Sequence, residues 1–127
     1  MDQNVIPLLL VEDEPDLREA LGEYLEACGF SVTAVSTAAD AFTSARERPP
    51  LILLTDLSLP DRRGDALLVE FHHDHPDCLL YVHSGDSSFV PPAALVACGL
   101  TRDHVLAKPA DLGKMVEKFH SDLTIKR

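Results

Sequence analysis

Short runs of apolar residues recur along the chain, and each run is followed by polar residues and turn formers. Runs of this length with almost no polar interruption are typical of strands that are buried on both faces of a parallel sheet. We predict five strands, over residues 5–11, 30–35, 51 to about 56, 79–83 and 104–107.

The segments between these strands carry apolar residues at helical spacing. After the first strand, Leu17, Leu21 and Leu25 fall on one stripe of a helix that we expect to begin at Pro15 and to end before Gly29. Four further helices are predicted: after a cap at Ser36 or Thr37, from Gly64 to about His72, after Pro91-Pro92 with Leu95, Val96 and Cys98 as its apolar residues, and after a cap at Asp111.

The order of elements is therefore a strand followed by a helix, five times. Short connections and right-handed crossovers make such a chain a parallel sheet with helices on both faces. We predict an α/β fold with a doubly wound five-stranded parallel sheet in a three-layer sandwich. The 127 residues suffice for a single domain over residues 1–127, with a core from about 5 to 124.

Composition and charge narrow the class of function. The net charge of −10 argues against direct binding of nucleic acid, whose phosphates need a basic surface, and against docking on anionic lipid. The three cysteines form no CxxC pair, which indicates buried thiols in a reducing compartment. Without a signal peptide or an apolar run of about 18 residues, we predict a cytoplasmic protein with no membrane contact.

Polar residues close four of the five apolar runs. They are Glu12 with Asp13, then Asp56, Ser84 and Lys108. Because the carboxyl ends of parallel strands meet at one edge of a sheet, we expect these side chains to converge on a single site.

Three carboxylates in one site repel each other, and a hard divalent cation resolves that conflict. Oxygen ligands at this density suit Mg²⁺. We expect Asp13 and Asp56 as direct ligands, Glu12 acting through water, and the backbone carbonyl of Ser58 completing the set. A solvated acidic loop would explain residues 12–14 alone, but it leaves Asp56 and Lys108 unexplained.

A carboxylate beside Mg²⁺, with a lysine and a hydroxyl opposite, is suited to phosphoryl transfer. Asp56 can attack phosphorus in line as a nucleophile. Lys108 would neutralise charge on the transferred group, and Ser84 would donate a hydrogen bond to one of its oxygens. The expected product is an aspartyl phosphate.

These residues carry a resemblance to a known family. The whole chain resembles a stand-alone receiver domain of the two-component response regulators. The matching motifs are Glu12-Asp13, Asp56-Leu-Ser-Leu-Pro60 with Gly64, Ser84-Gly85 and Lys108-Pro109. The resemblance implies a flavodoxin-like strand order 2-1-3-4-5 and a cis Lys108-Pro109 bond.

The resemblance also implies a function. Asp56 would accept phosphate from a histidine kinase or a histidine phosphotransfer protein. A protein effector would then contact the face made by the fourth helix, fifth strand and fifth helix. The domain would act as a signalling switch or phosphorelay intermediate, and it would catalyse only its own phosphorylation and dephosphorylation.

Three positions are expected to modulate the switch. Val105 stands three residues before the lysine, where the family commonly has an aromatic side chain that swings inward, and valine cannot act as that rotamer switch. Ser58 lies two residues after Asp56, where the family's side chain helps to set phosphoryl lifetime. Asp86 follows the Ser84-Gly85 pair.

Three other functions remain open at this stage. A haloacid-dehalogenase-like phosphatase carries a second acid where this chain has Ser58, and a flavin-binding electron carrier would find its phosphate repelled by residues 12–14. A receiver that binds partners without phosphorylation is the third alternative, and Val105 is its main support. His83 is either a packed strand residue or a pH-sensitive neighbour of the site.

Overall fold

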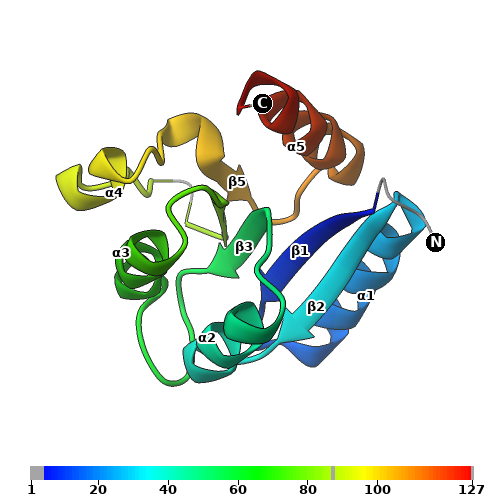
Figure 1. Cartoon of the computed structure of the whole chain (residues 1–127), viewed down its shortest axis with the longest axis horizontal. Coiled ribbons are helices and arrows are strands. Elements are labelled where there is room, and N and C mark those ends of the chain that lie inside the picture. Colours follow the sequence, from blue (N-terminus) through cyan, green and yellow to red (C-terminus); the bar gives the residue numbers. More distant parts are fainter. Residues whose placement is uncertain (1–4, 87, 127) are drawn as a thin grey trace.

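The computed structural model describes residues 5–86 and 88–126, and its centre is one parallel sheet (Figure 1). The strand order is β2-β1-β3-β4-β5, which confirms the predicted fold class and order. The strands are β1 (Ile6–Val11), β2 (Phe30–Val35), β3 (Ile52–Asp56), β4 (Leu79–Ser84) and β5 (Val105–Ala107).

Helices cover both faces of the sheet. They are α1 (Pro15–Ala27), α2 (Ala38–Glu47), α3 (Gly64–Asp74), α4 (Ala93–Ala97) and α5 (Leu112–Lys126), with a 3-10 helix at Arg102–His104. Helices α1 and α5 pack on one face, and α2, α3 and α4 pack on the other (Figure 1). None of the described helices is long and apolar enough to cross a lipid bilayer.

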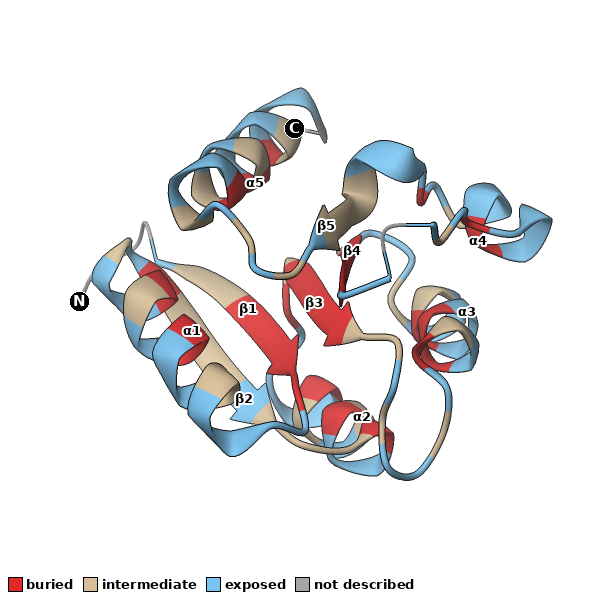
Figure 2. Ribbon diagram, turned by 180° about the vertical axis from the view of Figure 1, so that it is seen from behind, coloured by how far each residue is buried: buried red, intermediate tan, exposed pale blue. Residues whose placement is uncertain are grey.

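The core consists of two apolar layers separated by the sheet. Alternate residues of a strand point to opposite faces, so Leu8 and Leu10 pack with α1 and α5, whereas Leu9 and Leu53 pack with α2 and α3. Strands β1 and β3 are buried on both faces (Figure 2). This burial is why both strands are almost wholly apolar until the sheet ends.

The predicted ends of several elements agree with the structure. Thr37 caps α2 by accepting a hydrogen bond from Asp40 N at 3.1 Å, and Asp111 accepts one from Lys114 N at the start of α5. Gly29 and Gly99 follow α1 and α4 with positive φ angles, a conformation that glycine adopts without steric cost. The Lys108-Pro109 bond is cis, as the resemblance implied.

Other boundaries were wrong by one or two residues. β1 begins at Ile6 and β3 at Ile52, each one residue later than predicted, while β4 continues to Ser84 and α3 to Asp74. β5 begins at Val105 because His104 belongs to the preceding 3-10 helix, where its ring accepts a hydrogen bond from Thr101 N.

One of the apolar residues named for the fourth helix lies at the surface. Val96 of α4 is 52% exposed, whereas Leu95 is fully buried. α4 has only five residues, and so short a helix turns a single apolar side chain fully into the core.

The loop after β3 is fastened to α2. The Asp61 carboxylate accepts hydrogen bonds from Ala38 N and Ala39 N, at 2.9 and 3.0 Å. These backbone donors lower the pKa of Asp61 below its ordinary value, because they stabilise the charged carboxylate. The contact spans 23 residues of sequence and holds the loop that leads away from Asp56.

Candidate functional site

Three carboxylates meet at the carboxyl ends of β1 and β3. Glu12 and Asp13 directly follow β1, and Asp56 is the last residue of β3. One carboxylate oxygen from each of the three lies within 4.8 Å of the others. The structure therefore brings together the three acids that the sequence placed in one site.

Lys108 joins two of these acids. Its Nζ lies 2.9 Å from Asp56 Oδ2 and 2.9 Å from Glu12 Oε1. The lysine is positioned by its own backbone, because Lys108 N donates a hydrogen bond to Ser84 O at the end of β4. The ammonium group of Lys108 therefore lies beside the end of β3.

Burial and charge act in opposite directions on this cluster. Glu12 is 1% exposed, and burial raises its pKa above the ordinary value even though Lys108 and Glu14 N stabilise the charged form. Burial also opposes the charge on Lys108, but the hydrogen bonds to Asp56 and Glu12 hold the pKa of Lys108 above its usual range. The lysine is therefore charged at neutral pH.

The backbone around Asp56 is held by its own loop. Ser58 N donates a hydrogen bond to Asp56 Oδ1 at 3.2 Å, and the side chain of Ser58 is exposed. Gly64 N donates to Leu57 O at 2.7 Å, which brings the start of α3 against the end of β3. A Cβ at Gly64 would collide with Asp56 O, so only glycine permits this approach.

Ser84 ends β4 at the same edge of the sheet. Its hydroxyl accepts a hydrogen bond from Asp86 N at 3.0 Å, and the residue is buried. Within the described residues, the hydroxyl makes no hydrogen bond to Asp56. Asp86 is exposed and accepts two hydrogen bonds from Ser88, which lower its pKa below the ordinary value. Ser84 is thus at the edge where it was expected, although its hydroxyl is paired with Asp86 N rather than with Asp56.

A small cavity lies beside Ser84. Its volume is about 130 Å³, and Phe89, Arg102 and Val105 contribute to its walls. Val105 is half-buried and packs against the apolar layer that includes β4 and α4. The position where the family commonly has an aromatic residue is therefore filled here by a smaller side chain.

His83 is a packed strand residue, the first of the two alternatives left open by the sequence. It is 2% exposed, and neither ring nitrogen has a hydrogen-bond partner among the described residues. Burial, reinforced by the charge of Lys108, lowers the pKa of His83 to about 4. The ring is therefore neutral at pH 7.

Folding stability is expected to decline as the pH falls from about 6.5 to about 4. The unfolded chain binds a proton at His83 near its ordinary pKa of 6.5, whereas the folded chain does so only near 4, so acid favours unfolding. The slope is up to about 1.4 kcal/mol per pH unit. Urea unfolding across this range measures it. We expect His83→Leu to flatten the curve and His73→Leu, at an exposed site on α3, to leave it unchanged; equal slopes in both variants would contradict this account.

The donor set fits a hard divalent cation. Carboxylate oxygens from Glu12, Asp13 and Asp56 are the ligand type that Mg²⁺ prefers, and Asp13 is exposed at the mouth of the site. The single positive charge of Lys108 does not balance these three carboxylates, and a divalent cation would neutralise the excess of negative charge.

Sequence reasoning missed one positioning residue. Arg18 donates hydrogen bonds from Nη1 to the carbonyl oxygens of Glu12 (2.9 Å) and Asp13 (3.4 Å). The guanidinium thereby holds the backbone of the acidic pair from the second turn of α1. Its spacing within an ordinary amphipathic helix carries no signal for this role.

Comparisons with known proteins agree with this geometry. A family model described as the response regulator receiver domain matches residues 8–120. The response regulator receiver protein CpdR of Brucella abortus is 32% identical over 117 residues, which cover 91% of this chain and 95% of CpdR.

Two further relatives show how far the similarity extends in sequence and in fold. The transcriptional regulatory protein BaeR of Escherichia coli is 37% identical over 70 residues, which make up 55% of this chain and only 29% of BaeR. The crystal structure of a CheY-like response regulator receiver domain protein from Methanospirillum hungatei superposes with a TM-score of 0.86 at 23% identity, covering 96% of each chain. Strand order, the acidic site with its lysine and the match over residues 8–120 lead to one conclusion: the chain belongs to the receiver domain family of two-component response regulators.

Proposed function

We propose that the protein is a phosphoryl-accepting switch or phosphorelay intermediate in which Asp56 is the acceptor. The observation that carries this proposal is the position of Lys108 Nζ, 2.9 Å from both Asp56 and Glu12, in a site with a third carboxylate. A lysine held against the acceptor carboxylate can neutralise the negative charge of an incoming phosphoryl group.

In the proposed reaction an oxygen of Asp56 forms a bond to phosphorus while the bond from phosphorus to the donor breaks. The donor is a phosphohistidine of a kinase or phosphotransfer protein, and the released imidazole leaves with its electron pair and takes up a proton. Lys108 moves its ion pair from the Asp56 carboxylate to an oxygen of the phosphoryl group. Ser84 turns its hydroxyl to donate a hydrogen bond to another.

Glu12, Asp13 and Asp56 would hold Mg²⁺, with the backbone carbonyl of Ser58 as a further ligand. When bound, the cation would offset the negative charge that gathers as acceptor and phosphoryl group approach. Arg18 contributes by fixing the carbonyls of residues 12 and 13, so that the two acids keep their positions.

The proposed partners follow from the same chemistry. A sensor histidine kinase or histidine phosphotransfer protein supplies the phosphoryl group in the cytoplasm, and an effector protein contacts α4, β5 and α5. The domain turns over no substrate besides its own phosphoryl group. The smaller Val105 side chain beside Ser84 means that the signal reaches this face without an aromatic rotamer change at that position.

The test is intact mass after incubation with acetyl phosphate, with and without Mg²⁺. We expect one phosphoryl adduct on the wild type in Mg²⁺, and loss of the adduct on chelation or in Asp56→Asn. Asp74→Asn, at the exposed end of α3, is the matched control and should still be phosphorylated. If neither acetyl phosphate nor a cognate kinase gave an adduct, the protein would instead be a binding module that works without phosphorylation.

Ser58→Ala is expected to change the lifetime of the phosphoryl group. The Ser58 side chain is exposed beside the acceptor, where it can contact the water that attacks the phosphoryl group, while its backbone N–H holds Asp56 Oδ1. The substitution keeps that backbone bond and removes only the hydroxyl. Dephosphorylation followed by mass after removal of acetyl phosphate measures the rate, and equal rates for wild type and variant would refute the expectation.

A further inference from the structure

β2 lies at one edge of the sheet, so half of its backbone hydrogen-bonding groups face away from the other strands. Val35 O accepts a hydrogen bond from Glu12 N and so points toward the β1 side. Because these groups alternate along a strand, those of Val32 and Ala34 point outward. Outward groups of this kind are where an additional strand can pair.

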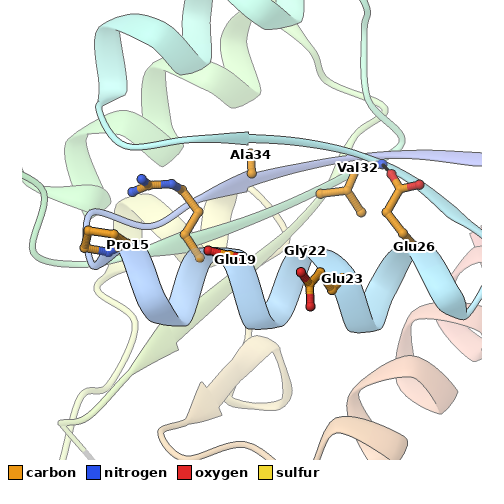
Figure 3. Close-up of a pocket in the computed structure, with 8 residues that line it drawn as sticks. Pro15, Glu19, Gly22, Glu23, Glu26, Val32 and Ala34 are labelled. Atoms are coloured by element: carbon orange, nitrogen blue, oxygen red, sulfur yellow. Dashed lines mark hydrogen bonds between the residues drawn. The ribbon is translucent and has the colours of Figure 1, made fainter.

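A side chain already occupies one of these positions. Val32 N donates a hydrogen bond to Glu26 Oε2 at 2.6 Å, across the gap between α1 and β2 (Figure 3). The carboxylate takes the place that a carbonyl of a neighbouring strand would have. The partner of Val32 N is therefore the exposed carboxylate of Glu26, which the carbonyl of an added strand could displace.

The space beside this edge is a groove of about 620 Å³ between α1 and β2. Val32 and Ala34 form its apolar wall, and no atom lies within 4 Å of the position of a Cβ at Gly22. Ala34 is exposed. The groove therefore has room for side chains of an added segment beside the open backbone.

The rim of the groove is negatively charged. Glu19, Glu23 and Glu26 follow one another at helical spacing along α1 and all line the groove (Figure 3). Among the described residues, no lysine or arginine forms an ion pair with any of them. Arg18 also lines the groove, but its guanidinium donates to the carbonyls of residues 12 and 13.

This charge pattern is unfavourable for the isolated helix. Glu23 and Glu26 are near the carboxyl end of α1, where the helix dipole favours cations, and the last turn has no basic residue. Glu19 and Glu23 are like charges four residues apart, which repel. A cationic partner would relieve both effects.

We propose that the groove between α1 and β2 binds an extended basic segment of a partner protein, which pairs with β2 as a sixth strand. In this complex a carbonyl of the partner segment accepts the hydrogen bond from Val32 N in place of Glu26, and the backbone of the segment pairs with Ala34. The lysines or arginines of the segment form ion pairs with Glu19, Glu23 and the displaced Glu26. A second copy of this chain is a poor occupant, because its own β2 edge would bring a like-charged stripe. The groove adjoins the acidic site at Arg18, but the proposed pairing with β2 does not require phosphorylation of Asp56.

The probe is the peptide acetyl-Lys-Val-Lys-Val-Lys-Val-amide, titrated into the ¹⁵N-labelled full chain at low salt. We expect the largest amide shifts at Val32 and Ala34, and at least about tenfold slower hydrogen exchange at Ala34 when the peptide is saturating. The control peptide acetyl-Lys-Val-Lys-Pro-Lys-Val-amide keeps the charge but lacks a ladder donor, and it should bind several-fold more weakly. Equal binding of the two peptides would reduce the effect to nonspecific charge attraction and overturn the proposal.

Charge-removing variants distinguish peptide binding in the groove from general attraction to an acidic protein. Glu19→Gln with Glu23→Gln leaves the β2 backbone untouched and removes two charges from the rim, so peptide affinity should fall about tenfold or more. Glu47→Gln, exposed on α2, is the charge control and should change affinity less than twofold. Amide shifts that map elsewhere, equal losses in the two variants, or pairing of β2 between copies of the free chain would each overturn the proposal.

Discussion

Lys108→Ala is expected to slow phosphorylation of Asp56 by acetyl phosphate about 10²- to 10³-fold, the usual effect of removing one preorganised charge donor from a reaction centre. The lysine lies 2.9 Å from both the acceptor and Glu12. Without it, the phosphoryl group approaches the three carboxylates of the site with no positively charged side chain beside them. Rates of adduct formation, measured by intact mass at saturating Mg²⁺, give the comparison.

The same substitution changes the charge state of the site. Glu12 is buried, and Lys108 is one of the groups that stabilise its charged form. Its pKa should therefore rise further in Lys108→Ala, and Mg²⁺ should stabilise the variant against unfolding more than it stabilises the wild type. Lys114→Ala, on the exposed surface of α5, controls for loss of a positive charge. A phosphorylation rate within threefold of wild type would contradict the role given to Lys108.

Gly64→Ala is expected to destabilise the fold by about 1–3 kcal/mol, the usual cost of overpacking, and to impair phosphorylation. A Cβ at this position would press into the backbone of Asp56 and Leu57, with Leu57 Cα at 2.8 Å. These are backbone atoms at the end of β3, so they cannot move aside as a flexible side chain would. The acceptor carboxylate must then leave its place beside Lys108. Urea unfolding and the acetyl phosphate reaction measure the two effects.

Gly22→Ala provides a control of opposite sign. Gly22 lies inside α1, and a Cβ there meets no atom within 4 Å. Alanine favours a helix interior over glycine by about 1 kcal/mol, so this variant should be more stable and fully phosphorylated. If Gly64→Ala were as stable and as reactive as Gly22→Ala, the close approach of Gly64 to Asp56 would have no structural importance.

The two variants test different parts of one arrangement. Lys108 supplies charge to the acceptor, whereas Gly64 allows the backbone of the acceptor to reach that charge. A loss of rate in Lys108→Ala while Mg²⁺ keeps its stability near that of the wild type, beside a loss of both in Gly64→Ala, would separate the electrostatic contribution from the positional one.

Local patterning was enough to predict the strands, the helices and the residues that gather at the sheet edge. Apolar runs marked β1, β3 and β4 because strands buried on both faces exclude polar residues until they end. Glu12, Asp56 and Lys108 stood out as the first charged residues after apolar runs. Parallel topology then placed these ends together without any knowledge of individual contacts.

Only the tertiary structure decided which distant groups touch. Arg18 holds the acidic pair, Asp61 caps α2 from 23 residues away, and Glu26 covers the edge of β2. Each contact depends on how two elements pack, and an exposed charged residue has the same local sequence signature whether or not it meets a backbone donor. His83 is the clearest case. The surrounding layers of the fold bury it, and this burial, reinforced by the charge of Lys108, lowers its pKa, whereas its neighbours in the chain gave no sign of either effect.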